Sequence, residues 1–401
     1  MNIGIDLRPL LSSVRTGVAE YTYELLDALF KIDQTNQYFL FYNSAKEKLE
    51  ISNWKLSRRV GRDPDFTSGE TGKVRFVRTK YPNKLFNASI SLFARPRLDR
   101  IRNKELGIRN IDVWFSPNIN FTTLSKGVKH ILTIHDLSFE HFPDCYSAKR
   151  RLWHRALNPR KQCERADLIL TPSESTRRDV VETYGIEEKK VKVLYPGLSS
   201  AFSGQRSADG ERGNEKREMV KKKYNLPDRF ILFLGTIEPR KNILGLIEAY
   251  KHLSQMSNVK CQMLIAGPLG WKYEPIRKAI AETPGARYIG YVLPEDKPAF
   301  YQLASFFVYP SLYEGLGFPV LEAMAAGTPV ITSNRSSLTE VAGDAAYLVN
   351  PDNVSELARA LELLLIDEKL RAFLIERGKR RAAEFRWEDS TRELMRLFTD
   401  S

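Results

Sequence analysis

Short apolar runs alternate with amphipathic stretches through the first half of the chain. Val18, Tyr21, Leu25 and Leu29 recur at helical spacing, whereas runs such as 38–42 are almost continuously apolar. Continuous apolar strands separated by helices are typical of a parallel sheet that helices cover on both faces. Strands are predicted at 2–6, 38–42, 74–78, 112–116, 130–134, 167–171 and 191–194, and helices at 18–32, 147–164 and 174–184.

The same rhythm returns in the second half, after a break at 195–197. Residues 203–223 are almost entirely polar, which predicts a linker between domains that leads into a charged helix. Two α/β domains, 1–196 and 197–384, are therefore predicted, with a ligand cleft between them, and residues 369–399 are expected to be helical only. Further strands are predicted at 230–234, 262–266, 287–290, 306–309, 330–333 and 346–349, and helices at 242–254, 273–283, 296–304, 319–326 and 353–366.

Composition places the chain among ordinary globular proteins, with 42% apolar and 28% charged residues. No apolar stretch approaches the ~18 residues of a transmembrane helix. The three cysteines are far apart, so a disulfide framework or zinc ribbon is not expected, and a reducing cytosol is the predicted compartment.

Most of the net charge of +13 lies in one segment. Residues 51–110 carry 15 basic and 5 acidic side chains, interleaved with Trp54, Phe86 and Phe93. This mixture predicts binding to an anionic membrane surface or a lipid diphosphate acceptor, with nucleic acid as a further possibility. The alternative is a solvated helix pair whose arginine stems lie over the core.

A glycine loop follows the strand predicted at 306–309, in the sequence SLYEGLGFPVLEAM. Gly315 and Gly317 allow a ligand to approach the main chain, and Pro319 is favoured at the start of a helix. The N–H groups of Phe318, Val320 and Leu321 are expected to face an anion, so the loop predicts a phosphate site.

Charged side chains accompany this loop and the one after 230–234. Glu314 and Glu322 flank the glycine loop and would be fixed acceptors for ligand hydroxyls, although Glu322 alone could compensate the helix dipole. Arg240 and Lys241 open a predicted helix, where the dipole disfavours cations unless an anion such as diphosphate lies between them. Ordinary surface charge is the alternative for this pair.

These motifs resemble those of family 4 glycosyltransferases, which are retaining enzymes of the GT-B fold that use nucleotide sugars. The resemblance covers nearly the whole chain: YEGLGFPVLEAMAAGTPVI, FLGTIEPRKN, TPSESTRRDVVETYGI, LTIHDLSF and Thr16-Gly17-Val18. It implies two Rossmann-like domains facing a central cleft and a C-terminal helix, 385–401, that packs back on the first domain.

The resemblance also implies residue roles. Glu322 would bind the ribose hydroxyls, Glu314 the sugar, and Lys241 with Arg240 the diphosphate. Relatives often carry arginine directly after the glycine that ends the strand, but Thr236 follows Gly235 here, so Arg240 either replaces that cation or only neighbours Lys241. The remaining donor contacts would come from Gly17, His135, Gly235, Val292, Gly317, Phe318, Pro319 and Val320, and His135, Glu314 and Lys241 would be catalytic.

The expected activity is retaining, metal-independent transfer of a hexose to a lipid-linked or polysaccharide acceptor. The amino-acid sequences of these motifs resemble those of bacterial mannosyltransferases that use GDP-mannose. UDP-sugars are the alternative donors. Asp63 and Asp65 match the acidic pair of metal-dependent transferases but lie in a polar loop, so no metal or other cofactor is expected. The enzyme would be cytoplasmic, with a peripheral position on the inner face of the membrane as a further expectation, and would not bind nucleic acid. A nucleic-acid-binding protein, a silent GT-B scaffold and a GT-B phosphorylase or epimerase are the alternatives.

Overall fold

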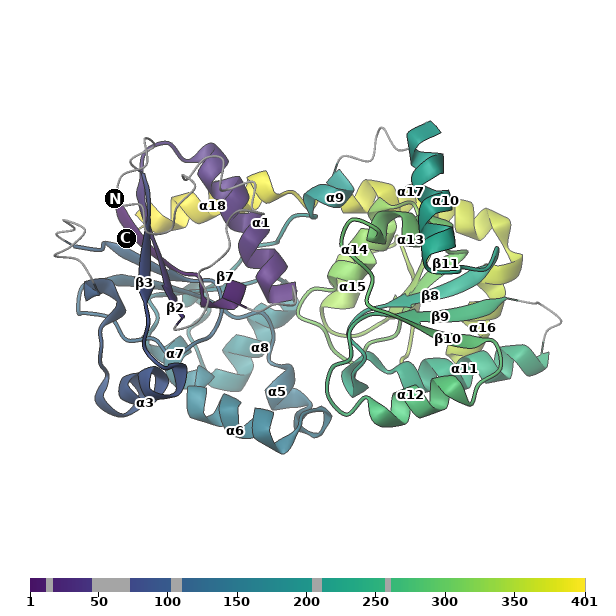
Figure 1. Ribbon diagram of the computed structural model, residues 1–401, viewed down its shortest axis with the longest axis horizontal. Helices are drawn as coiled ribbons and strands as arrows, with labels where there is room; N and C mark the ends of the chain where they lie inside the picture. The colour runs from purple at the N-terminus through teal and green to yellow at the C-terminus, as the bar shows by residue number, and fades with distance from the viewer. Residues whose placement is uncertain (12–16, 45–72, 102–109, 204–210, 257–260, 401) are drawn as a thin grey trace.

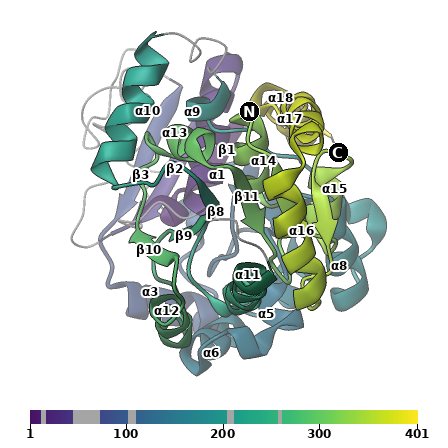
Figure 2. The ribbon, with the colours of Figure 1, turned by 90° about the vertical axis from the view of Figure 1, so that its right-hand side faces the viewer.

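The chain folds into two α/β units that lie side by side, as this computed structural model shows (Figure 1). The structure describes all residues except 12–16, 45–72, 102–109, 204–210, 257–260 and 401. Each unit contains a parallel sheet between layers of helices, which confirms the predicted fold class (Figures 1 and 2).

The described residues of the first unit form a seven-stranded parallel sheet in the order β3-β2-β1-β4-β5-β6-β7. Its middle strand is β4, and in the neighbouring β1 Ile3 pairs with Tyr38 on one side and Val113 of β4 on the other. The strands are β1 (Asn2–Asp6), β2 (Gln37–Asn43), β3 (Val74–Thr79), β4 (Val113–Ser116), β5 (Lys129–Thr133), β6 (Leu168–Thr171) and β7 (Val191–Val193). The helices are η1 (Arg8–Leu11), α1 (Gly17–Ile32), α3 (Asn83–Phe93), η3 (Leu98–Arg100), α5 (Ser138–His141), η4 (Pro143–Cys145), α6 (Ala148–Leu157), α7 (Pro159–Arg165), α8 (Glu174–Tyr184) and η5 (Glu188–Lys190).

The helix predicted at 147–164 is two helices, α6 and α7. Asn158 between them has φ 46°, in the left-handed region, and its side chain accepts a hydrogen bond from the N–H of Lys161. Pro159 then begins α7. Proline cannot continue the preceding helical hydrogen-bond ladder, and asparagine tolerates the left-handed conformation, so the pair ends one helix and begins the next.

The second unit has a six-stranded parallel sheet among its described residues, in the order β10-β9-β8-β11-β12-β13. Its strands match the predicted positions within one residue. They are β8 (Phe230–Leu234), β9 (Gln262–Ala266), β10 (Ala286–Gly290), β11 (Phe306–Tyr309), β12 (Val330–Ser333) and β13 (Tyr347–Val349). Its helices are α9 (Ser200–Ser203), α10 (Glu211–Lys223), η7 (Pro239–Lys241), α11 (Ile243–Met256), α12 (Glu274–Ala281), α13 (Lys297–Leu303), α14 (Phe318–Ala325), α15 (Ser337–Ala342), α16 (Val354–Ile366) and α17 (Glu368–Ala382). They are followed by α18 (Trp387–Thr399), which packs on the first unit.

The charged helix predicted within 203–223 is confirmed as α10, but the described part of this stretch belongs to the second unit rather than to a connection between the units. Leu198 and Phe202 are already buried in the core of the second unit. The described part of the stretch is mainly α10, which lies against the second unit, where Lys216 donates to the Glu295 carbonyl at 2.5 Å. Polarity here reflects an exposed helix of the second unit rather than a connection.

The chain passes between the units twice, and the two passages are adjacent. At Gly197, an added Cβ would lie 2.2 Å from the main-chain nitrogen of Trp387, so glycine is required for the passages to approach this closely. The Leu198 N–H donates to the Phe385 carbonyl at 3.1 Å. After the second passage, α18 lies on the first unit, where Trp387, Leu394 and Phe398 are buried with residues of α1 and the first sheet.

The basic segment 51–110 lies partly outside the described residues, including Trp54, Asp63 and Asp65. Its described part contains β3, α3 and η3. Phe86 and Ile90 of α3 are buried in a small core with Trp114, whereas Leu85, Leu92 and Phe93 are exposed. No described helix is long and apolar enough to cross a membrane.

Candidate active site

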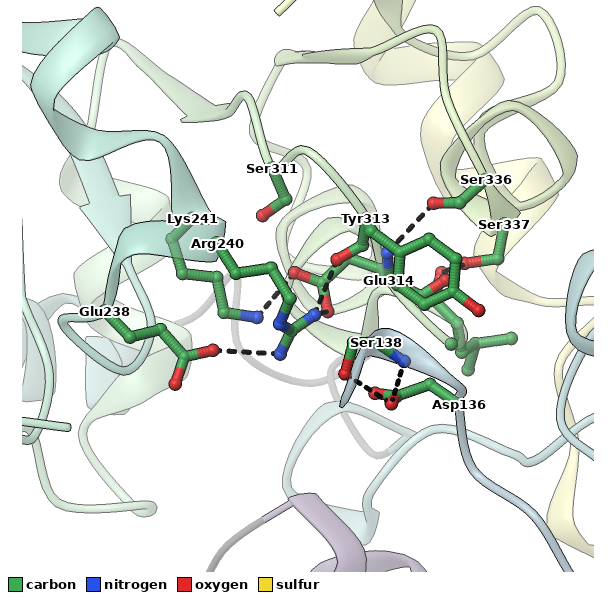
Figure 3. A network of polar contacts seen from close by, with 12 residues as sticks. Asp136, Ser138, Glu238, Arg240, Lys241, Ser311, Tyr313, Glu314, Ser336 and Ser337 are labelled. Carbon is green, nitrogen blue, oxygen red and sulfur yellow. Dashed lines mark hydrogen bonds and ion pairs between the residues drawn. The ribbon is translucent and has the colours of Figure 1, made fainter. Parts of the chain in front are cut away.

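Glu314 is the centre of a buried charge cluster (Figure 3). Its Oε1 accepts a hydrogen bond from Lys241 Nζ at 2.5 Å, and its Oε2 accepts one from Arg240 Nη1 at 3.0 Å. Arg240 and Lys241 follow β8, and Glu314 follows β11, the neighbouring strand. Because the strands are parallel, their following loops meet at one edge of the sheet, where ligands of open α/β sheets bind.

The cluster balances its own charges. Arg240 Nη2 donates to Glu238 at 2.9 Å, and Lys241 Nζ donates to the Tyr309 hydroxyl at 2.8 Å. Arg240 and Lys241 are only 8% and 6% exposed, so the alternative that they are ordinary surface charge is wrong. Two cations buried beside two carboxylates form a rigid group that can interact with an added anion.

The ionisation of Glu314 follows from these contacts. Burial alone would raise the pKa of this carboxyl, but the charges of Arg240 and Lys241 lower it to about 2. Burial and the neighbouring guanidinium lower the pKa of Lys241 from its ordinary value. Glu314 is therefore a carboxylate with both oxygens bound to cations, which makes it a poor nucleophile and a fixed acceptor.

Serine side chains fix the loop that carries Glu314. The Glu314 N–H donates to Ser336 Oγ at 2.9 Å. Ser337 Oγ approaches two carbonyl oxygens of the loop, those of Glu314 at 2.8 Å and Leu316 at 2.9 Å. The glycine loop is thus held by hydrogen bonds from α15 and the residue before it.

Glu322, in α14, is 7% exposed and lies against α13. Its carboxylate accepts hydrogen bonds from the Tyr301 hydroxyl at 2.9 Å and from Lys297 Nζ at 3.1 Å. Burial disfavours the Lys297 ammonium, yet the Glu322 charge keeps the pKa of Lys297 above its ordinary value. These side-chain contacts give Glu322 a role beyond compensation of the helix dipole.

Lys297 was missed by the sequence analysis although a signal was present. It is the first residue of α13, where the helix dipole disfavours a cation. The same signal pointed to Arg240 and Lys241. In all three cases the structure supplies a carboxylate partner from the α14 region.

The start of α14 differs in part from the expectation. Gly317 precedes the helix with φ 105°, and Pro319 lies in the first turn. The Val320 N–H donates to the Gly317 carbonyl at 2.9 Å, and that of Leu321 approaches the same oxygen at 3.5 Å. A tight first turn thus gives these two N–H groups an acceptor within the chain, and the anion contacts of Phe318, Val320 and Leu321 stay predictions.

The resemblance also implies donor contacts by Gly17, Gly235 and Val292. Gly17 begins α1, and a Cβ built there would have no described atom within 4 Å. The Gly235 N–H donates to the Ala266 carbonyl at 3.0 Å, which ties β8 to β9. The Val292 side chain is buried in the second core, while Tyr291 and Leu293 beside it are exposed. The predicted contact of Val292 with the nucleotide base stays a prediction. With the side chain buried, such a contact would be made by the main chain of Val292.

His135 follows β5 in the first unit. Its Nε2 lies 2.8 Å from the Pro117 carbonyl, and because a carbonyl can only accept, Nε2 carries the proton. The ring packs edge-on against Tyr21 with centroids 4.7 Å apart. Burial lowers the pKa of His135. His135 is therefore neutral near pH 7, in a fixed orientation and tautomer.

The first unit touches the glycine loop directly at His135. A Cβ on Gly315 would lie 1.9 Å from the His135 carbonyl oxygen, so this close approach requires glycine. The Gly315 carbonyl accepts hydrogen bonds from Ser173 at 2.6 Å and Thr176 at 3.2 Å. His135 and Glu314 are thereby held in one site by contacts between the units.

A second contact between the units uses Glu340 of α15. Its carboxylate accepts the main-chain N–H groups of Glu174 at 2.9 Å and Ser175 at 3.1 Å, at the start of α8. It also accepts the Tyr195 hydroxyl at 2.6 Å. A negative charge at a helix N-terminus interacts favourably with the helix dipole. Glu340 therefore caps α8 from the other unit.

Among the described residues, no group of three or more His, Cys, Asp or Glu side chains could hold a metal ion. Asp63 and Asp65 lie outside the described residues. Metal independence stays a prediction.

Two families account for almost all of the chain. Residues 15–202 match the family described as Glycosyltransferase Family 4, and residues 214–381 match Glycosyl transferases group 1. A relative from Escherichia coli, O-antigen chain mannosyltransferase B, is 30% identical over 305 residues, which are 75% of this chain and 78% of the relative. The chain belongs to the family 4 glycosyltransferases. The glycosyltransferase interpretation of the sequence is thereby confirmed.

Other relatives and a solved structure extend this result. The serotype-specific mannosyltransferase WbdA of Escherichia coli is 34% identical over 252 residues, covering 61% of this glycosyltransferase but only 30% of WbdA. A Campylobacter jejuni enzyme, an N-acetylgalactosaminyltransferase named for a diphospho-undecaprenol substrate, is 28% identical over 55% of this chain and 57% of its own. The fold is similar to that of sucrose-phosphate synthase from Thermosynechococcus elongatus, with a TM-score of 0.71, 18% identity and 99% and 98% coverage.

Proposed function

We propose that this glycosyltransferase moves a mannosyl group from GDP-mannose to a lipid-linked or polysaccharide acceptor, with retention of anomeric configuration and without a divalent metal. The observation that carries the proposal is the buried cluster in which Glu314 binds both Lys241 and Arg240. It places two fixed cations at the edge of the sheet where the donor of a GT-B enzyme would lie.

The cations would act on the leaving group. As the bond between the sugar C1 and the diphosphate oxygen breaks, negative charge grows on the diphosphate. Lys241 and Arg240 would stabilise that charge without reorganisation, because their partners already fix them. Preorganised charge of this kind is usually the largest electrostatic contribution to catalysis.

Retention would follow from attack on the same face of the sugar that the diphosphate leaves. The acceptor oxygen would bond to C1 as the bond to phosphate breaks, and the hydroxyl proton would pass to the departing diphosphate. Glu314 is not suited to a covalent intermediate, because both its oxygens are bound to cations. His135, neutral and fixed by Pro117, would orient the sugar through its other ring nitrogen or its main chain.

The donor and acceptor are proposed from the relatives. Two relatives named as mannosyltransferases support mannose, and the relative named for diphospho-undecaprenol supports a lipid-linked acceptor. Such an acceptor would place the enzyme in the cytoplasm, peripherally on the inner face of the membrane. A screen of GDP- and UDP-sugars is expected to give transfer with GDP-mannose, and turnover with a UDP-sugar alone would contradict the donor assignment.

Glu322→Ala is expected to raise the Kd of GDP by roughly 10- to 100-fold, because a hydrogen bond to a charged group contributes ~1.5–3 kcal/mol. Isothermal titration calorimetry measures this directly. Glu376→Ala, on the exposed side of α17, is the matched control and should bind GDP like the wild type. Glu322→Gln, which keeps the side-chain volume beside Tyr301, guards against a folding defect. Unchanged binding in both Glu322 variants would defeat the ribose assignment.

Transfer is expected to continue in excess EDTA and to give the same anomer as the donor. The physical reason is that Lys241 and Arg240 supply the positive charge that a metal supplies in other transferases. Turnover is followed after chelation, and the anomeric configuration of the product is determined by NMR. Activity that EDTA removes and Mg²⁺ or Mn²⁺ restores would refute metal independence, and an inverted product would refute retention.

A further inference from the structure

A large cavity lies at the outer edge of the first sheet, where β3 ends. Its volume is about 810 Å³. It is formed by the end of β3 and the residues just after it, together with the segment that follows α3. Figure 1 shows α3 below the end of β3, on the side of the first unit that faces away from the second. The cavity is therefore separate from the cluster around Glu314.

The lining of the cavity is strongly basic. Its described lining includes five cations and no acid: Arg78, Lys80, Arg95, Arg97 and Arg100. The nearby Asp99 is buried, and its carboxylate accepts the Ser125 N–H at 2.8 Å while lying 4.0 Å from Arg100 Nε. Cations gathered in a concave surface attract and concentrate anions. Each arginine can also bind two oxygens of one phosphate group at the same time.

Tyr81 lines the cavity, and α3, the helix between its two lining segments, carries exposed apolar side chains. The helix α3 begins two residues after Tyr81 and ends two residues before Arg95, and both of those residues line the cavity. Tyr81 is 55% exposed, and Leu85, Leu92 and Phe93 on α3 are 69%, 74% and 71% exposed. The core requires only the other side of α3, so these side chains are available to an apolar ligand.

The cavity also has a defined position relative to the active site. Lys80 follows β3 just as His135 follows β5, and the carboxyl ends of parallel strands share one edge of a sheet. Three strands, β2, β1 and β4, separate β3 from β5. At ~4.8 Å between neighbouring strands, the two sites are about 19 Å apart along this edge. A bound molecule with several sugars could span that distance.

We infer that this cavity binds the diphosphate group of the lipid carrier to which the acceptor glycan is attached. The five cations bind the diphosphate, and Tyr81 with the exposed residues of α3 contacts the first part of the lipid chain. The glycan then extends along the edge of the sheet toward His135. This inference rests on the proposed function, since it identifies where a lipid-linked acceptor is held.

Farnesyl diphosphate, which combines a diphosphate with a short prenyl chain, is the probe. Calorimetry is expected to show that the full chain binds it at least about tenfold more tightly than inorganic pyrophosphate. The variant Arg95→Ser/Arg97→Ser/Arg100→Ser should raise its Kd at least about tenfold, because three charge-assisted contacts are lost from an open site. The Kd of GDP should not change. Arg359→Ser/Arg380→Ser/Arg392→Ser, which removes the same charge from exposed sites on α16, α17 and α18, should bind both ligands like the wild type.

The other results would overturn the inference. Pyrophosphate binding as tight as that of farnesyl diphosphate would exclude a lipid contact. Unchanged farnesyl diphosphate binding in the cavity variant would exclude the cavity. If the variant lost only its sedimentation with phosphatidylglycerol vesicles, the basic residues would serve the bilayer surface instead. In each case, normal GDP binding would leave the proposed function intact. If the wild-type protein did not bind GDP at all, that result would count against the proposed function itself.

Discussion

Replacing Lys241 with methionine is expected to lower kcat for sugar transfer by about 10²- to 10³-fold, the loss typical for removal of one preorganised charge donor. Lys241 Nζ donates to both Glu314 and Tyr309, so its position is fixed before any donor binds. Methionine keeps the length of the side chain and removes the charge. Steady-state transfer at saturating GDP-mannose measures the effect, and kcat within threefold of the wild type would contradict the assignment.

A loss of stability has to be separated from this loss of catalysis. Removing one partner of a buried ion pair costs ~3–5 kcal/mol, because the other charge stays buried. The double variant Lys241→Met/Glu314→Gln removes both charges and leaves Arg240 paired with Glu238. It should regain most of the Tm that Lys241→Met loses while remaining inactive. Lys278→Met, an exposed position on α12, is the control for both measurements.

Gly315→Ala is expected to lower kcat by about 100-fold, because a misplacement of ~1 Å at a reacting centre can cost that much. The new Cβ would lie 1.9 Å from the His135 carbonyl oxygen, so the first unit and the glycine loop must move apart. GDP binding should change little, since Glu322 and Lys297 lie within the second unit. Kinetics together with calorimetry test both parts.

Gly185→Ala is the matched control for this substitution. Gly185 ends α8 with a positive φ of 68°, and its added Cβ would meet no described atom within 4 Å. It should reduce stability slightly and leave kcat near the wild-type value. Equal effects of the two substitutions on kcat would show that the contact with His135 is unimportant for transfer.

Regular patterns in the sequence predicted most of the strands. The apolar runs of β8 and β11 are buried on both faces, so their composition carries the signal that identifies a strand. Arg240 and Lys241 were found because cations at the start of a helix violate a local preference, and Glu314 and Glu322 were found because they flank a glycine loop. The sheet order then brings Arg240 and Glu314 together, although 74 positions separate them.

The features that were missed depend on contacts between distant residues. Nothing near Glu340 in the sequence shows that it caps α8 in the other unit. The tight first turn of α14 depends on the conformation of Gly317, which composition does not specify. A linker and an exposed helix are both rich in polar residues. The polarity of residues 203–223 therefore could not show whether they connect the two units or cover the surface of one.

The packing of α18 has a consequence for how this glycosyltransferase is made. Trp387, Leu394, Leu397 and Phe398 belong to the core that also contains Ile3, Ile5 and Leu25. During synthesis, domains usually fold in order as they leave the ribosome. Here the unit that is translated first stays without part of its core until α18 emerges, so we expect the second unit to fold first and the nascent first unit to expose apolar surface in the meantime.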